Sequence, residues 1–143
     1  RRSSDLAAEK DGMMKLGINP THPGDHKIAE EGVDVQSFAI DTLVETNQAQ
    51  RICLIKIDVQ GAEERVLEGA QKTIERDHPA IFIELDDEAL KKMGSNGERV
   101  INWILDRKYR IIKLTKNSTG ITISKSEALQ LCQKGKYTDL LFI

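Results

Sequence analysis

The chain has 143 residues, a usual length for one domain, and its 21 basic and 23 acidic residues give a formal net charge of −2. This balance, with aromatic residues at only 4%, argues against a nucleic-acid or anionic-membrane partner, because such surfaces need clustered positive charge or rings that stack. No apolar run approaches the roughly 18 residues of a membrane span, so we expect a single cytoplasmic domain over residues 1–143.

The first 40 residues predict a small addition to a sheet. Residues 13–18 read as a short apolar strand, and residues 33–40 alternate as a second strand would. Between them, residues 19–25 contain two prolines and a glycine, which is typical of a loop. We expect the two strands to form a hairpin-like addition near the main sheet.

Two histidines in this loop region have the spacing of metal ligands. His22 and His26 are four residues apart, as two ligands on one face of a helix would be. Pro23 and Gly24 lie between them and exclude that helix. We therefore expect no metal site there.

A strand, a crossover helix and a second strand are predicted for residues 52–86. One apolar run ends at Gln60 and Gly61, and a second covers residues 81–85. Between them an apolar stripe recurs at helical spacing, formed by Ala62, Val66, Leu67, Ala70 and Ile74. Both runs are nearly continuous, as in central parallel strands, and a right-handed crossover brings their carboxyl ends together. Open sheets of this kind bind ligands at those ends, so function is expected near Asp58 and Glu84.

Four charged side chains gather at these strand ends. Lys56 and Asp58 are two residues apart and share one face of the first strand, as Glu84 and Asp86 do on the second. Because an unpaired buried charge is costly, Lys56 must contact a carboxylate, with Glu84 or Asp41 as candidates, or reach solvent through a cleft.

The residues leave two interpretations of Asp58 open. In one, Asp58 caps the helix that begins after Gly61, and Lys56 belongs to a structural ion pair. In the other, Asp58 lines a substrate pocket as a base or an orienting acceptor. For Gly61, a tight turn explains the glycine better than contact with a ligand does.

From residue 87 onward, helices and strands alternate. Asp87 is expected to cap a helix over residues 88–93, and a capping-box pattern at 95–98 to begin a helix over 97–108. The remaining pattern predicts strands at residues 109–114 and 137–143. It also predicts a weak strand at residues 121–124 and a short helix at residues 126–133.

Single residues with distinctive chemistry are mostly expected to be structural. Cys53, in a strand, and Cys132, in a helix, are too few for a disulfide framework and are interpreted as small core side chains. Trp103 has apolar neighbours at helical spacing and is expected to pack in the core or at its edge. His78 precedes a proline in a turn and is expected to be exposed.

The central segment resembles the signature of FkbM-type methyltransferases. The matching stretches are LIKIDVQGAE at residues 54–63, VLEGA at 66–70, Pro79, and Ile83-Glu84. The resemblance extends over about residues 10–143. It departs at Gln60, where the family often carries glutamate, so no carboxylate is present at that position.

This resemblance implies a class I S-adenosylmethionine-dependent methyltransferase with a Rossmann-like α/β sheet and an antiparallel last strand pair. Such enzymes hold the cofactor mainly with a glycine-rich loop after the first strand and an acidic residue after the second. Both features would lie before Arg1. We therefore expect the carboxyl-terminal half of a methyltransferase domain with an incomplete sheet, and we assign no cofactor-binding residue.

By the same resemblance, the expected reaction transfers a methyl group from S-adenosylmethionine to a hydroxyl of a sugar or secondary metabolite. Two residues are expected to be catalytic, Asp58 and Glu84. Four others are expected to bind the substrate or support the site: Lys56, Gln60, Gly61 and Asp86.

Two other functions stay open. A non-catalytic α/β interaction module, or a degenerate methyltransferase scaffold, would use the same sheet and form a homodimer through its exposed edge. A metal-assisted enzyme would use Asp58 and Glu84 as oxygen ligands.

Overall fold

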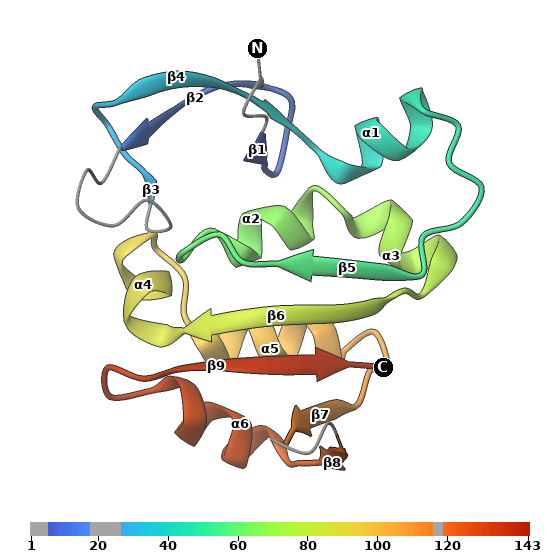
Figure 1. The fold of residues 1–143 in the computed structure, drawn as a ribbon, viewed down its shortest axis with the longest axis vertical. Helices are drawn as coiled ribbons and strands as arrows, with labels where there is room; N and C mark the ends of the chain where they lie inside the picture. Colours follow the sequence, from blue (N-terminus) through green and yellow to red (C-terminus); the bar gives the residue numbers. More distant parts are fainter. Residues whose placement is uncertain (1–5, 18–26, 116–118) are drawn as a thin grey trace.

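The computed structural model describes residues 6–17, 27–115 and 119–143, which form two sheets and a set of short helices (Figure 1). One sheet has four strands, in the order β1 (Leu6–Ala7), β4 (Val33–Phe38), β2 (Gly12–Gly17) and β3 (Lys27–Ile28). The other has five strands, in the order β5 (Leu54–Ile57), β6 (Ala80–Asp86), β9 (Tyr137–Phe142), β7 (Ile111–Leu114) and β8 (Gly120–Thr122). The helices are α1 (Ile40–Thr46), α2 (Glu63–Glu68), α3 (Gln71–Asp77), α4 (Asp87–Lys92), α5 (Gly97–Leu105) and α6 (Lys125–Cys132). The predicted α/β class is confirmed.

The smaller sheet contains the hairpin-like addition predicted from the sequence. β2 and β4 pair antiparallel, with Met14 opposite Val35, and β1 adds to β4 in parallel. β4 ends before residue 40, where the strand was expected to end, because α1 begins there and the Asp11 carboxylate accepts a hydrogen bond of 2.8 Å from the N–H of Ala39. The predicted loop at 19–25, with His22, lies outside the described residues.

The five-stranded sheet contains the predicted parallel strand pair, but the expectation that both strands are central was wrong for β5, which lies at an edge of the described sheet. β5 and β6 pair in parallel, with Leu54 opposite Ala80 and Ile57 opposite Ile83. β9 runs antiparallel to both β6 and β7, which confirms an antiparallel pair for the last two main strands. In the described part of the chain, β5 forms one edge of this sheet.

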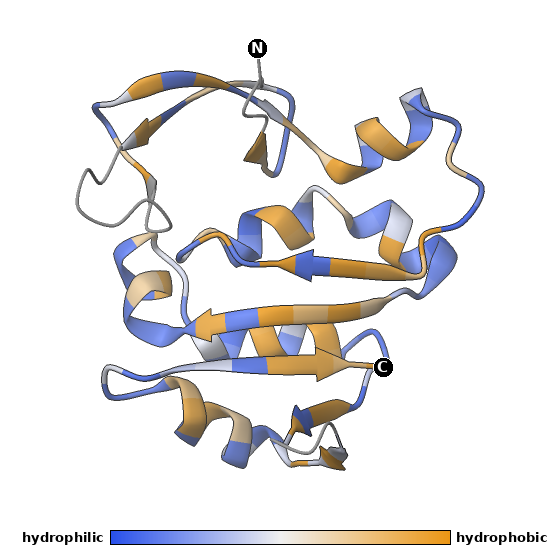
Figure 2. Ribbon diagram, in the orientation of Figure 1, coloured by the Kyte–Doolittle hydropathy of each residue, from blue (hydrophilic) through white to orange (hydrophobic). Residues whose placement is uncertain are grey.

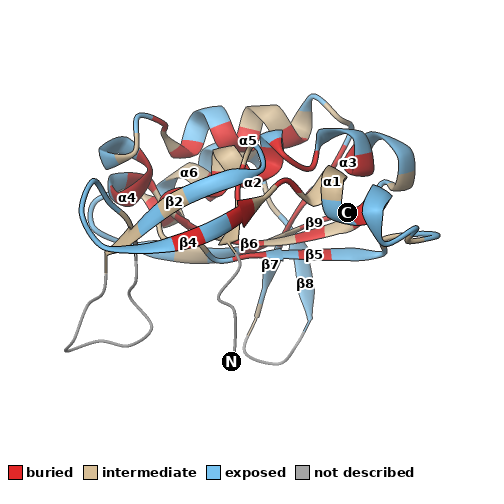
Figure 3. Ribbon diagram, turned by 90° about the horizontal axis from the view of Figure 1, so that it is seen from above, coloured by how far each residue is buried: buried red, intermediate tan, exposed pale blue. Residues whose placement is uncertain are grey.

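The helices cover one face of the five-stranded sheet, as the view from above shows (Figure 3). Alternate strand residues point to that face and are buried: Ile55, Ile57, Ile81, Ile83, Leu85, Leu140 and Phe142. They pack against helix residues that include Leu67, Ile74, Leu90, Ile101 and Ile104. Apolar colour accordingly runs along most of β5 and β6 and along the carboxyl-terminal half of β9, with hydrophilic bands between (Figure 2). The opposite face is more open, since Leu54 is 58% exposed and Tyr137 is 67% exposed.

The predicted crossover helix is two helices, α2 and α3, which meet at Gly69 and Ala70. The carbonyl of Gly69 accepts a hydrogen bond of 2.8 Å from the N–H of Asp41 in α1, so it is engaged outside the helix. A side chain at position 69 would also collide with the carbonyl of Ala8. The break therefore results from contacts with distant parts of the chain, which helical spacing does not reveal.

Two helix caps differ from the predicted ones. Asp86, not Asp87, caps α4, and Asp87 is buried with its carboxylate bound to Lys91 at 2.7 Å and to the N–H of Gly97 at 2.8 Å. Asn96, rather than Ser95, caps α5 by accepting from the N–H of Arg99.

The helix ends also differ near the carboxyl terminus. α5 ends at Leu105, three residues earlier than expected. A capping box is present further along the chain, where Ser124 and Glu127 bond reciprocally at the start of α6.

The remaining single-residue expectations are mostly confirmed. Cys132 is buried, but the prediction for Cys53 was wrong, because its side chain is exposed just before β5. His78 is exposed and its ring lies 4.2 Å from the ring of Tyr109. Trp103 packs at the edge of the core, and the Arg107 guanidinium lies 3.5 Å from the centre of its indole ring.

Candidate active site

The candidate site lies where β5 and β6 end. Because these strands are parallel neighbours, their carboxyl ends lie at the same side of the sheet (Figure 1). Asp58 directly follows β5. Glu84 and Asp86 lie at the carboxyl end of β6. The structure therefore brings together the two strand ends that the sequence identified.

Lys56 of β5 contacts Asp58, which directly follows the strand. The distance from Lys56 Nζ to Asp58 Oδ2 is 3.4 Å, and the two side chains are 63% and 40% exposed. The predicted ion pairs of Lys56 with Glu84 or Asp41 are not formed. An exposed pair at this distance adds little to stability, so Lys56 is available for other contacts.

Gln60 joins the two strand ends. Its amide Nε2 donates a hydrogen bond of 3.2 Å to Oε1 of Glu84. No hydrogen-bond partner of Gln60 was predicted from the sequence. The structure thus makes Gln60 the group that holds Glu84 in place.

Glu84 is half-buried among other acidic groups. Desolvation raises the pKa of Glu84, and the charges of Asp58 and Asp139 raise it further, while the Gln60 hydrogen bond and Lys56 oppose the rise. Asp139 lies directly opposite Glu84 on the antiparallel strand β9. Sequence reasoning did not include Asp139, because its position beside Glu84 depends on the register of β9.

The turn after β5 has an uncommon backbone. Gln60 has φ = 52° and Gly61 has φ = 103°, so two successive residues are in the positive-φ region that favours glycine. A Cβ atom at Gly61 would lie 2.6 Å from the carbonyl oxygen of Ala89 in α4. The glycine is therefore required by both the turn and the close approach of α4.

The capping interpretation of Asp58 was wrong. Ala62 occupies the N-cap position of α2, and no side chain caps it. The N–H of Gly61 instead donates a hydrogen bond of 2.9 Å to the carboxylate of Glu63.

Glu63, the first residue of α2, is buried. The residue is only 2% exposed, and its second oxygen, Oε2, is buried without a hydrogen-bond partner among the described residues. Desolvation raises its pKa. A carboxylate two residues after a turn glycine is the one sequence signal that points to this arrangement.

Asp86 has a structural role at the rim of the site. Its Oδ1 accepts hydrogen bonds from the N–H groups of Glu88, at 2.9 Å, and Ala89, at 3.2 Å. These bonds fix the start of α4, the helix against which Gly61 packs.

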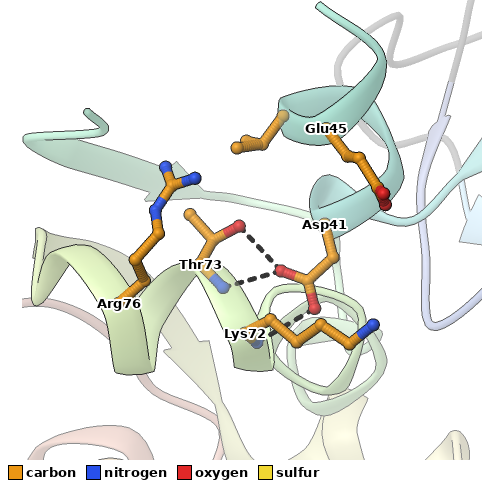
Figure 4. Close-up of a pocket in the computed structure, with 6 residues that line it drawn as sticks. Asp41, Glu45, Lys72, Thr73 and Arg76 are labelled. Carbon is orange, nitrogen blue, oxygen red and sulfur yellow. Dashed lines mark hydrogen bonds between the residues drawn. The ribbon is translucent and has the colours of Figure 1, made fainter. Parts of the chain in front are cut away.

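A surface pocket of about 270 Å³ lies between α1 and α3 (Figure 4), and it is not lined by Asp58 or Glu84. Its lining residues are Asp41, Val44, Glu45, Lys72, Thr73 and Arg76. Asp41 accepts from the N–H groups of Lys72, at 3.0 Å, and Thr73, at 2.8 Å, and from the Thr73 hydroxyl at 2.7 Å. Both of its oxygens are occupied in capping α3, so Asp41 is a structural residue.

Two further pockets, of about 330 Å³ and 310 Å³, lie beside α4 and beyond α6. Neither these pockets nor the one between α1 and α3 is lined by Asp58 or Glu84.

The turn at Gly61 does not fit a cofactor-binding glycine loop. The tight turn at Gly61 follows a strand and precedes a helix, but its N–H is bound by Glu63 and its Cα faces the backbone of α4. The turn therefore offers no free backbone cradle to a ligand.

Metal-binding groups and membrane helices are also not found in what the structure describes. Over residues 6–17, 27–115 and 119–143, no three His, Cys, Asp or Glu side chains are grouped so that they could hold a metal ion. His22 and His26 lie outside these ranges. None of the helices in the same ranges is long and apolar enough to span a membrane.

The α/β fold, with acidic residues at the carboxyl ends of neighbouring parallel strands, agrees with comparison against protein families. The family model described as Methyltransferase FkbM domain matches residues 7–111, and the chain belongs to this family. The match confirms the resemblance seen in the sequence, although it ends at the start of β7 rather than at residue 143. Searches of curated proteins and of solved structures found no significant match.

Proposed function

We propose that this chain is part of an enzyme that transfers a methyl group from S-adenosylmethionine to a hydroxyl of a small molecule, such as a sugar or a secondary metabolite. Membership of the FkbM methyltransferase family supports methyl transfer as the reaction. The observation that carries the position of the site is the meeting of Asp58 and Glu84 at the ends of two parallel strands. The Rossmann-like class I arrangement of the complete sheet is part of this proposal.

Asp58 is the proposed catalytic acceptor. A hydroxyl that attacks a methyl carbon must lose its proton, and a carboxylate within hydrogen-bond reach can take or orient that proton. Asp58 fits this role because its side chain is accessible and its nearest partner, Lys56, is held only at 3.4 Å.

Glu84 is the proposed second catalytic carboxylate of the site. Its raised pKa makes it a stronger proton acceptor than an ordinary glutamate, and Gln60 orients its carboxylate. Lys56 balances the negative charge of the group, while Asp86 and Gly61 hold the surrounding backbone.

In this proposal the cofactor is bound largely by groups other than the described residues. We therefore expect the isolated 143-residue chain not to bind S-adenosylmethionine at micromolar concentration. Isothermal titration calorimetry tests this expectation, and micromolar affinity would mean that the cofactor site lies within residues 1–143.

The catalytic proposal is tested with the full gene product that contains these residues. Labelled S-adenosylmethionine is supplied with a panel of hydroxyl and amine acceptors, and label is expected in a hydroxyl product. Asp58→Asn should lower turnover by about 10²-fold or more, the usual contribution of a positioned acid or base, while cofactor affinity stays nearly unchanged. Asp34→Asn is the matched control, because Asp34 is an exposed carboxylate on β4 that binds Lys15.

Three outcomes contradict the proposal. Asp58→Asn with normal turnover would remove Asp58 from the reaction, and loss of cofactor binding with normal turnover per bound cofactor would assign it to the cofactor site. Label in amines but not in hydroxyls would replace the proposed acceptor class.

A second candidate function is favoured by the exposed edge of β5. The chain would then be a non-catalytic interaction module that forms a homodimer by pairing β5 with β5 of another copy. A full gene product without methyl transfer to any acceptor, and without affinity for S-adenosylmethionine, would favour this function. The cytoplasmic location stays a prediction from composition.

A further inference from the structure

Glu63 is buried at an unusual cost. A carboxylate removed from water needs hydrogen bonds that replace its hydration, yet Oε2 of Glu63 has no hydrogen-bond partner among the described residues, while Oε1 accepts from the N–H of Gly61 at 2.9 Å. A residue that is 2% exposed at the start of a helix would be more stable as an apolar side chain if it served packing alone. The position of Glu63 therefore calls for a reason other than core stability.

The contact of Glu63 fixes a backbone that is otherwise unfavourable. Gln60, a residue with a side chain, is held at φ = 52°, and Gly61 follows at φ = 103°. Positive φ at a residue other than glycine is retained only when neighbouring contacts impose it. The carboxylate of Glu63 accepts a hydrogen bond from the N–H of Gly61 in the turn, and the carbonyl of Ala89 lies close to Gly61.

The same turn determines where the Gln60 side chain points. From this backbone conformation its amide reaches the adjacent strand and donates to Glu84 Oε1 at 3.2 Å. A chain of contacts thus runs from the buried Glu63, through Gly61 and Gln60, to the accessible Glu84.

We propose that Glu63 is a positioning residue of the candidate active site: it holds the turn at Gly61, and the turn holds Gln60 against Glu84. The inference deepens the proposed function, on which it rests for the role of Glu84. Glu63 itself does not touch a substrate.

The proposal predicts a change in the titration of Glu84 that a purely structural role would not cause. The groups that face Glu84 are Lys56 and Asp58 of β5, Asp139 of β9, and Gln60 of the turn. A hydrogen bond from Gln60 favours the charged carboxylate, so its loss raises the pKa of Glu84. Removing the negative charge of Glu63 would act in the opposite direction and lower that pKa.

The experiment is a carbon-13 NMR titration of the Glu84 carboxyl in the 143-residue chain. Gln60→Ala is expected to raise the pKa of Glu84. Glu63→Ala is expected to raise it by a smaller amount, because the loss of the negative charge of Glu63 offsets part of the rise. The double variant should add nothing further, because both changes remove the same contact. Glu63→Gln keeps an oxygen that accepts from Gly61 and should not raise the pKa.

Three results would overturn the proposal: an unchanged or lowered pKa of Glu84 in Glu63→Ala, additive shifts in the double variant, or no shift in Gln60→Ala. If Glu63→Ala does not fold, Glu63→Asp takes its place, since the shorter side chain withdraws from Gly61 and should give a smaller rise. The titration needs no methyl transfer, so failure of the proposed reaction and failure of the positioning role are separate outcomes.

Discussion

Gly61 and Gly94 both have a positive φ, 103° and 84°, but their surroundings differ. A Cβ at Gly61 would meet the carbonyl of Ala89 at 2.6 Å, whereas no described residue lies within 4 Å of a Cβ at Gly94. The two glycines therefore separate the effect of backbone conformation from the effect of a steric collision.

Gly61→Ala is expected to lower the free energy of unfolding by about 3 kcal/mol or more, and Gly94→Ala by about 1 kcal/mol. Both variants carry the cost of positive φ, but only the first forces α4 away from the turn. Urea denaturation followed by circular dichroism measures the difference. Equal losses in the two variants would show that the turn and α4 are not in close contact.

The ionised carboxylate of Asp77 is expected to stabilise the folded protein at neutral pH, and acid should remove this stabilisation. Its carboxylate binds Arg76 and accepts a hydrogen bond of 2.8 Å from the N–H of Ile52, and these contacts lower its pKa to about 2. A lowered pKa stabilises the folded state above the ordinary value of 3.8, and this contribution is lost as the pH falls toward about 2. Asp77→Asn should therefore be less stable than the parent at pH 7, and the gap in urea midpoints should narrow as the pH falls below about 4.

For Glu84, the expected change of stability with pH is opposite to that for Asp77. Because its pKa is raised in the folded state, the protein loses stability as the pH rises above the ordinary value of 4.5 and through the folded pKa. Glu84→Gln should gain stability relative to the parent between pH 4 and pH 7, measured by the same urea midpoints. A constant difference across this range would mean that Glu84 is not desolvated.

At the level of the helices, α3 depends on a cap supplied by another element. Ala70 stands at its N-cap without a side-chain bond, and the carboxylate of Asp41 in α1 accepts three hydrogen bonds from Lys72 and Thr73 instead. The cap ties α1 to the crossover, so its loss affects two helices at once.

Asp41→Ala is expected to lower the free energy of unfolding by about 1–2 kcal/mol, the usual cost of a lost helix cap. Asp41→Asn should lower the free energy of unfolding by less, since its amide oxygen still accepts one of these hydrogen bonds. Glu45→Ala is the control, because Glu45 lines the same pocket (Figure 4) and makes no side-chain hydrogen bond within the described residues. A loss in Asp41→Ala no larger than in the control would contradict the cap.

The elements that could be predicted are those governed by local pattern. Continuous apolar runs identified β5 and β6, and their spacing correctly predicted parallel pairing. The break between α2 and α3 could not be predicted, because it depends on Asp41 and on Ala8, which lie far away in the sequence.

The same distinction applies to the candidate site. Strand alternation placed Asp58 and Glu84 near one another, but Asp139 and the buried Glu63 depend on β9 register and on the turn backbone. Such features follow from tertiary structure, so propensity and periodicity do not contain them.

At the scale of the whole molecule, the layered arrangement is one-sided. The helices cover one face of the five-stranded sheet (Figure 3), and within the described residues β5 has a strand neighbour on only one side. Unpaired N–H and C=O groups on such an edge favour pairing with another strand.

A homodimer through β5 predicts that Leu54→Lys weakens self-association, because it places a charge on the edge strand. Leu114→Lys is the control, since Leu114 is also exposed, at 41% against 58% for Leu54, but lies on β7 between two other strands. Sedimentation velocity over a range of protein concentrations gives the dimer fraction. Equal dimer fractions in both variants would exclude β5 as the interface.

The contact between Trp103 and Arg107 has a practical consequence. The sequence has a single tryptophan, and it lies on α5, where the guanidinium of Arg107 stacks on its ring at the margin of the core. Its fluorescence therefore reports one defined location, without a second indole to obscure the signal. When α5 separates from the sheet, the emission should shift to longer wavelength, so the protein carries its own optical probe of that event.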